Sequence, residues 1–201
     1  LPSRTGLGSS STFAVGMLHA LSALVQIMPT KMQLAETAIH IEHEVLKETV
    51  GCQDQVMAAF GGLNRIEFLP NDQFRVNPVI LDTQRLSDLQ EHMLLFFTGF
   101  SRTASEIARE QIARIGAHKN ELFRIREMVD EAIAILTGQG DLAEFGRLVH
   151  ESWLLKRTLS PKVAPAIVDQ IYDEALSAGA IGGKLLGAGG GGFMLVFAKP
   201  E

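Results

Sequence analysis

LPSRTGLGSSSTFAVGMLHAL, residues 1–21, joins a glycine- and serine-rich loop directly to an apolar segment. Gly6 and Gly8 can adopt backbone angles that other residues resist, which lets main-chain N–H groups turn toward a ligand. The hydroxyls of Ser9–Ser11 then stand at the start of a helix, where backbone donors are unpaired. That helix is indicated by apolar residues at helical spacing, namely Phe13, Met17, Leu21 and Leu24. Taken alone, the segment favours an ordinary core helix capped by serine over a phosphate-binding helix N-terminus.

The composition limits the class of protein. With 201 residues, 46% of them hydrophobic, the chain can form one large or two small domains. A net charge of −5 with scattered basic residues argues against a general nucleic-acid-binding protein, although local donors can still hold a phosphorylated ligand. Cys52 is the only cysteine, and nothing resembles a signal peptide or a membrane span. We therefore expect a soluble, cytoplasmic protein.

Local signals outside the first helix begin with a capping box. Thr30 and Gln33 have the spacing of this motif and open a helix expected over 31–48. Its expected buried stripe consists of Leu34, Ala38, Ile41 and Val45. Gly51 ends this helix, and a short helical piece is expected within 51–62.

Two β elements follow. Residues alternate between polar and apolar at 65–68 and 74–77, on either side of a Pro-Asn-Asp turn, which predicts a hairpin. The run Leu94–Phe97, ended by Thr98-Gly99, predicts a short buried strand. The sequence pattern changes near Leu89, where the hairpin gives way to a strand and helices.

The segment from Ser101 to Ala178 is almost wholly helical in pattern. Four helices are expected: the first from Ser101 to about Gly116, the second over 118–137, the third capped by Asp141 with Glu144, and the fourth from Pro161. The expected buried face of the fourth consists of Ile167, Ile171 and Ala175. Trp153 and Tyr172 are expected in the core rather than at a ligand.

A second glycine loop lies near the C-terminal end, at Gly187–Gly192, and a strand over 193–197 is expected after it. The loop satisfies G-x-G-x-x-G, but a dinucleotide fingerprint needs a following helix, so that interpretation fails. A Walker A loop fails as well, because Leu185 follows Gly183-Lys184. A tight backbone crossing would explain glycine here. Four consecutive glycines nevertheless carry an entropic cost that invites a functional explanation.

Three motifs now stand in order along the chain. P-x-x-x-G-L-G-S-S-S spans Pro2–Ser11, an acidic helix leads to G-C-Q-D-Q, and K-L-L-G-A-G-G-G-G-F begins at Lys184. The chain resembles the GHMP kinase family, and its first and third motifs resemble that family's second and third signatures. The resemblance implies an α+β GHMP kinase fold of two domains. Residues 1–90 would be the C-terminal part of the ATP-binding domain, and 91–201 a helix-rich, ferredoxin-like C-terminal domain.

Within this family, four stretches most resemble bacterial kinases of heptose 7-phosphate: GGLNRIEF, TGFSRTASEI, ESWLLKRTLS and GAIGGKLLGAGGGGF. Family members carry further residues ahead of the serine loop, including a first motif. We therefore expect this chain to be the C-terminal part of a kinase, either a fragment, a cleaved product or one piece of a split protein. We expect it to bind ATP weakly by itself.

The resemblance also implies roles for individual residues. The residues matching the loop that wraps the ATP phosphates are Gly6, Leu7, Gly8, Ser9 and Ser10. Ser10 and Glu42 match the ligands of Mg²⁺, with Glu44 as the fallback for the carboxylate. Asp54 matches the catalytic base that deprotonates the sugar hydroxyl. Without the resemblance, the two glutamates would be solvated helix carboxylates and Asp54 a helix cap.

The second loop has an implied role too. The residues expected to close over the transferring phosphoryl group and the sugar are Gly187, Ala188, Gly189 and Gly190. Arg102 and Lys184 are weaker candidates for holding an anionic sugar phosphate, because most such residues are merely solvated. The implied function is ATP-dependent phosphorylation of a sugar or sugar phosphate, with heptose 7-phosphate first. The alternatives are a galactokinase-like sugar 1-kinase and a non-catalytic GHMP-fold sensor or subunit.

Overall fold

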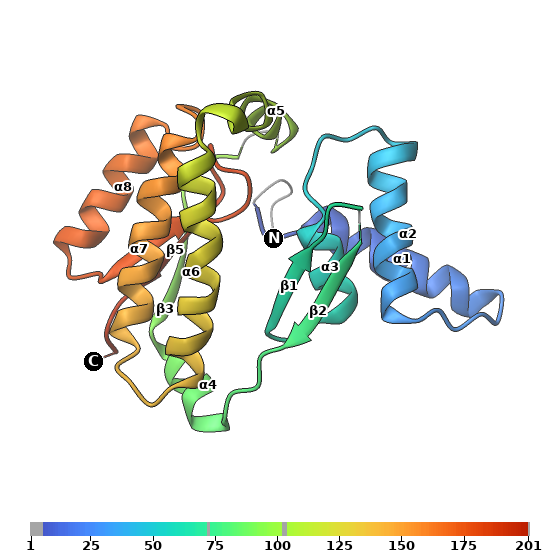
Figure 1. The fold of residues 1–201 in the computed structure, drawn as a ribbon, viewed down its shortest axis with the longest axis horizontal. Helices are drawn as coiled ribbons and strands as arrows, with labels where there is room; N and C mark the ends of the chain where they lie inside the picture. Colours follow the sequence, from blue (N-terminus) through green and yellow to red (C-terminus); the bar gives the residue numbers. More distant parts are fainter. Residues whose placement is uncertain (1–5, 72, 102–103, 201) are drawn as a thin grey trace. The chain divides into compact units, whose positions relative to one another are not determined.

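The computed structural model describes residues 6–71, 73–101 and 104–200. The chain divides into two compact units, Leu1–Val79 and Ile80–Glu201 (Figure 1). The sequence placed a boundary between residues 90 and 91, whereas helix α4 (Thr83–Glu91) falls inside the second unit. Helices and small antiparallel sheets occur in both units, which confirms the α+β class. Within the described residues, no helix combines the length and apolarity needed to cross a membrane.

The first unit packs three α-helices beside a hairpin. Its elements are α1 (Ser9–Leu24), α2 (Lys31–His40), the one-turn π-helix η1 (Ile41–Val45), α3 (Gln53–Phe60), β1 (Asn64–Phe68) and β2 (Phe74–Pro78). The hairpin is antiparallel, with Asn64 opposite Pro78 and Phe68 opposite Phe74. The predicted hairpin and the short helix after Gly51 are therefore confirmed.

Helix α1 forms as predicted, but its apolar stripe does not face a core within this unit. Its buried residues are Ser11 and Val15, and Val15 packs against Leu34 and Ala38 of α2. The stripe used to predict the helix is exposed instead: Phe13 66%, Met17 43%, Leu21 52% and Leu24 78%. The predicted serine cap is also wrong. The N-cap residue is Gly8, at a φ of 67°, and no side chain caps the helix in the described part of the chain.

The predicted capping box at α2 is confirmed. The Thr30 hydroxyl accepts from the Gln33 backbone N–H, and the Gln33 side chain accepts from the Thr30 N–H. The buried stripe is right at Leu34 and wrong at Val45, which is 63% exposed. At Ile41 the α-helix continues as the π-helix η1. A π turn contains more residues than an α turn, so it rotates the side chains that follow around the helix axis. Glu42 lies in this turn and is buried.

The second unit places helices against a three-stranded antiparallel sheet. Its further elements are β3 (Met93–Phe97), α5 (Ala104–Arg114), the 3₁₀ turn η2 (Ile115–Ala117), α6 (Lys119–Thr137), α7 (Ala143–Thr158), α8 (Ala166–Ser177), β4 (Gly182–Leu185) and β5 (Phe193–Phe197). The strand order is β3-β5-β4. Helix α6 lies beside α7 (Figure 1), and both α7 and α8 pack against β4.

The core of this unit lies between α7, α8 and the sheet. Trp153 and Tyr172 are fully buried there and meet edge to face, as predicted for core aromatics. The start predicted for the fourth helix is wrong, because α8 begins at Ala166, after Pro165. Its buried residues are accordingly Val168 and Tyr172, while Ile167 is 47% exposed.

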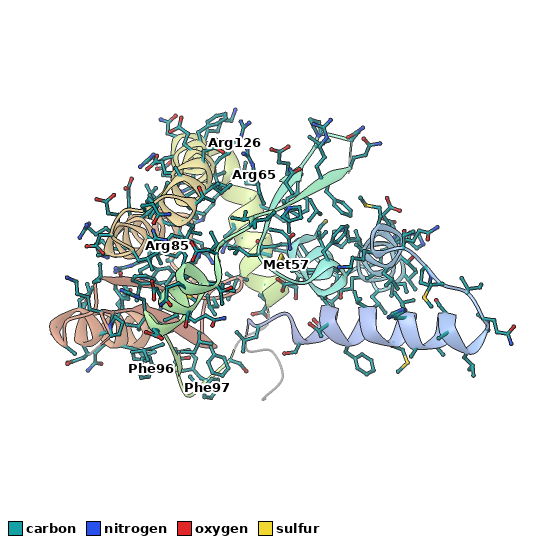
Figure 2. All side chains as sticks on the ribbon, turned by 90° about the horizontal axis from the view of Figure 1, so that it is seen from below. Met57, Arg65, Arg85, Phe96, Phe97 and Arg126 are labelled. Atoms are coloured by element: carbon teal, nitrogen blue, oxygen red, sulfur yellow. The ribbon has the colours of Figure 1, made fainter. Side chains whose placement is uncertain are left out.

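Strand β3 forms where predicted but is not buried. Leu94, Leu95, Phe96 and Phe97 are between 42% and 53% exposed. In the sheet that the structure describes, β3 is an edge strand beside β5, and helices α7 and α8 pack against β4 rather than over β3. Figure 2 shows Phe96 and Phe97 at the margin of the unit. Strand β4, which the sequence did not predict, occupies the opposite edge.

Candidate functional site

The serine loop presents backbone donors at the start of α1. Gly6 and Gly8 have φ angles of 78° and 67°, in the region that favours glycine. The first backbone bond into α1 runs from the Thr12 N–H to the Gly8 carbonyl at 2.8 Å. Because no described side chain caps the helix, the N–H groups of its first turn remain available. This geometry favours the anion-binding interpretation of the loop.

Asp54 lies against this loop. It sits in the first turn of α3, and a Cβ built on Gly8 would be 3.4 Å from its Cγ and 3.5 Å from its Oδ2. Asp54 is an exposed residue, but its neighbours shield the carboxyl partly from water, and this desolvation raises its pKa above the ordinary value. The helix-cap alternative is wrong, since Cys52 is the N-cap residue and no side chain caps α3 in the described residues. The structure thus brings the predicted base to the predicted phosphate loop.

Glu42 also meets the serine loop, through Ser11. The Ser11 hydroxyl donates to Glu42 Oε1 at 3.1 Å, and the Gln55 side-chain amide donates to Oε2. All three side chains are buried, with Glu42 8% exposed. Ser10, the serine predicted to share the metal with Glu42, is exposed, and among the described residues Ser11 takes its expected place beside the carboxylate.

The fallback carboxylate does not reach this cluster. Glu44 is exposed and pairs with Lys47 at 2.9 Å, and this hydrogen bond lowers the pKa of Glu44. The choice of Glu42 over Glu44 is therefore the one that the geometry favours. No group of three or more His, Cys, Asp or Glu side chains that could hold a metal occurs in the described residues. One carboxylate with a hydroxyl still fits Mg²⁺, which takes few protein ligands and completes its shell with phosphate oxygens and water.

The second glycine loop joins β4 to β5, so no helix follows it. Part of its glycine content is structural. A Cβ on Gly189 would lie 2.9 Å from Val163 Cα, and one on Gly191 would lie 2.8 Å from the Phe100 ring. The Gly190 N–H also donates to the Val163 carbonyl at 2.8 Å. The tight-crossing explanation therefore holds at these positions.

The start of the same loop is more open and contacts polar side chains. Gly187 is exposed, and its carbonyl accepts from Lys156 Nζ at 2.5 Å. The Ala188 carbonyl accepts from the Gln111 amide at 2.8 Å. Sequence reasoning missed Lys156, Gln111 and Gln55, because each looks like an ordinary polar residue of a helix. The signal for Gln55 was its place beside Asp54 in G-C-Q-D-Q.

Three predicted positions remain to be placed. Lys184 lies on β4, partly buried, and burial lowers its pKa. Arg102 and Pro2 lie outside the described residues. The predicted residues thus form two sets, one around Gly8 in the first unit and one around Gly187 in the second.

Comparison with known proteins gives the family. Residues 1–62 match the GHMP kinases N terminal domain, and residues 128–201 match the GHMP kinases C terminal domain. The chain is 33% identical over 202 residues to a D-glycero-alpha-D-manno-heptose 7-phosphate kinase of Campylobacter jejuni, covering 100% of this chain and 59% of the relative. It is 30% identical to an L-fucokinase/L-fucose-1-P guanylyltransferase of Bacteroides fragilis, covering 99% of this chain and 21% of that protein.

A solved structure agrees with these sequence relatives. The crystal structure of a D-glycero-D-manno-heptose 1-phosphate kinase of Bacteroides thetaiotaomicron superposes with a TM-score of 0.70 at 32% identity, covering 100% of this chain and 55% of that one. The chain thus spans little more than half the length of that structure and of the Campylobacter relative. The N-terminal family model covers the serine loop, and the C-terminal family model covers the second glycine loop. The chain belongs to the GHMP kinase family.

Proposed function

We propose that the full-length protein transfers the γ-phosphoryl group of ATP to a hydroxyl of a sugar or sugar phosphate, with heptose 7-phosphate as the first candidate. The observation that carries this proposal is the contact between Asp54 and Gly8, which puts a carboxylate of raised pKa beside a helix N-terminus suited to phosphate. Relatives named as kinases of phosphorylated heptoses support the choice of substrate.

Asp54 acts as the general base in this proposal. Its carboxylate accepts the proton of the attacking hydroxyl, and a raised pKa makes it a better acceptor than an ordinary aspartate. Phosphoryl transfer passes through a loose transition state, so catalysis consists mainly of positioning and charge neutralisation. The N–H groups at the start of α1 supply donors for the phosphate oxygens. The loop at Gly187–Gly190 would close over the acceptor sugar.

Glu42 would hold Mg²⁺ together with a hydroxyl of the serine loop. Ser11 already contacts Glu42, and Ser10, one residue earlier, is exposed at the same helix end. The ion would supply positive charge for the phosphate oxygens. Gln55 holds the Glu42 carboxylate in place by its hydrogen bond. A cytoplasmic location, where ATP is supplied, is part of the same proposal.

The test is sugar-dependent ADP release by the full-length protein. Heptose 7-phosphate should support turnover, with unphosphorylated galactose and fucose as comparison substrates. The 30% identity to a fucokinase keeps an unphosphorylated sugar as the second candidate. Faster turnover with galactose or fucose would replace the substrate assignment. Nucleotide binding without turnover on any sugar would contradict the kinase proposal and favour a sensor or subunit.

A further inference from the structure

Two lysines lie together beside the second glycine loop. Lys156 belongs to the last turn of α7, and Lys184 to β4. Helix α7 runs close along β4, because both contact positions are glycine: a side chain at Gly182 would collide with the Gly146 carbonyl. Trp153 is fully buried on this face of α7, and Lys156 follows it by one turn. The close packing therefore holds both lysine side chains near the loop.

No counter-ion of either lysine lies among the residues that the structure describes. No carboxylate of a described residue lies within ion-pair distance of Lys156 or Lys184, although both side chains are partly buried. Neighbouring cations are paired, as Arg157 with Asp169 at 2.9 Å and Lys162 with Glu110 at 3.2 Å. Burial, and then the charge of Lys184, lower the pKa of Lys156 to about 7. Two adjacent, partly buried ammonium groups cost free energy unless an anion joins them.

Backbone donors complete the surroundings. The carbonyl of Gly187 accepts from Lys156, which fixes the lysine at the open start of the loop. The backbone N–H groups of Gly187, Ala188 and Gly189 donate to no acceptor within the described residues, whereas those of Gly190 and Gly192 do. Successive N–H groups in positive-φ loop conformations, with φ at 67° for Gly187 and 114° for Gly189, form concave anion sites.

We propose that Lys156, Lys184 and the start of the glycine loop bind the phosphate monoester that the acceptor sugar already carries. The identity of that ligand rests on the proposed function. The nucleotide phosphates are assigned to the serine loop and α1, so the second site is left for another phosphate. A neutral sugar would leave both ammonium groups uncompensated, so the pair selects phosphorylated acceptors over galactose or fucose.

The site can be tested without turnover by measuring how tightly the full-length protein binds inorganic phosphate. The measurement is equilibrium dialysis with labelled phosphate. Lys156→Met and Lys184→Met keep the aliphatic stem and should each weaken binding at least tenfold. Lys119→Met is the matched control, since this lysine is exposed in the same unit, and it should bind as the wild type does. Unchanged binding in both site variants would overturn the proposal.

Competition identifies the source of the phosphate. Heptose 7-phosphate should displace the labelled phosphate, and ATP and unphosphorylated heptose should not. Displacement by ATP alone would assign the pair to the nucleotide and overturn the acceptor assignment. A measurement on the wild type avoids the risk that a variant misfolds. NMR of its lysine side chains should show that phosphate raises the pKa of two lysines. No change in any lysine pKa would contradict the site.

The two proposals fail in different ways. If the kinase proposal is wrong, ADP release is absent while phosphate binding still depends on Lys156 and Lys184. If the phosphate site is wrong, the variants turn over heptose 7-phosphate with unchanged KM. When both hold, Lys184→Met should raise KM for the sugar phosphate and leave KM for ATP within about twofold.

Discussion

Gly8→Ala tests two properties of the serine loop separately. Its stability reports the backbone strain at Gly8, and its turnover reports the contact with Asp54. Gly8 has a φ of 67°, and placing an L-residue in that region costs roughly 1–2 kcal/mol. The new Cβ would stand 3.4 Å from the Asp54 Cβ and Cγ, which is ordinary contact, so no further steric cost is expected. The free energy of unfolding should therefore fall by about 1–2 kcal/mol. The added methyl group should also occupy space beside the carboxylate, where the attacking hydroxyl and the phosphate would lie, and so reduce turnover.

Gly61→Ala provides a control that strains the backbone without a contact to Asp54. Gly61 has nearly the same φ, 65°, but a Cβ there would meet nothing within 4 Å. Urea denaturation should show a loss of stability in both variants, and the loss should be at least as large in Gly61→Ala, because Gly61 has a ψ of 174° and Gly8 a ψ of 24°. Only Gly8→Ala should lose turnover in the ADP-release assay, by at least about tenfold, because small misplacements of reacting groups are costly. Equal turnover in the two variants would refute the placement of Asp54 at the serine loop, and so would unchanged stability of Gly8→Ala.

Three further predictions follow from the same contacts. Gln55→Leu removes a donor to the buried Glu42 and should lower the free energy of unfolding by about 1.5–3 kcal/mol in urea denaturation, whereas the exposed Gln53→Leu should change it little. The affinity of the Lys156–Lys184 site for sulfate should fall about tenfold from pH 6 to pH 8, because binding requires protonated Lys156, whose pKa is about 7. The charged group that faces Lys156 is Lys184 of β4. A sulfate affinity that calorimetry finds unchanged with pH would contradict this. The Asp54 pKa is raised in the folded state, so the ionised carboxylate opposes folding above that pKa, and Asp54→Asn should melt no lower than the wild type at pH 7, with the difference shrinking in acid.

Local patterns predicted those parts of the fold that depend on neighbouring residues alone. The capping box at Thr30 and Gln33 formed as expected, because both of its hydrogen bonds join residues three apart. The hairpin formed because its alternation and turn are also local. Which face of a helix is buried was less predictable. The stripe from Phe13 to Leu24 indicates a helix correctly, but periodicity does not reveal which face the rest of the unit covers.

The site depended on tertiary features that a sequence pattern does not show. Glu42 and Val45 both lie in the π turn η1, where Glu42 is buried and Val45 exposed, and the hydroxyl that reaches the carboxylate is that of Ser11 rather than Ser10. Strand β4 was missed because Gly182 and Gly183 resemble loop residues. In the structure both are required by close backbone approach, Gly182 to α7 and Gly183 to β5. Lys156 was missed because a helical lysine ordinarily lies in solvent.

The central claim is that Asp54 is the base of a sugar-phosphate kinase, and Asp54→Asn tests it most directly. Asparagine keeps the size of the side chain and removes its capacity to accept a proton. ADP release dependent on heptose 7-phosphate should be measured for the wild-type and variant full-length proteins, with thermal melts and ATP affinity as controls. The account predicts a loss of turnover of about 10²–10⁴-fold with a melting temperature no lower than that of the wild type. Turnover within a few-fold of the wild type would contradict it.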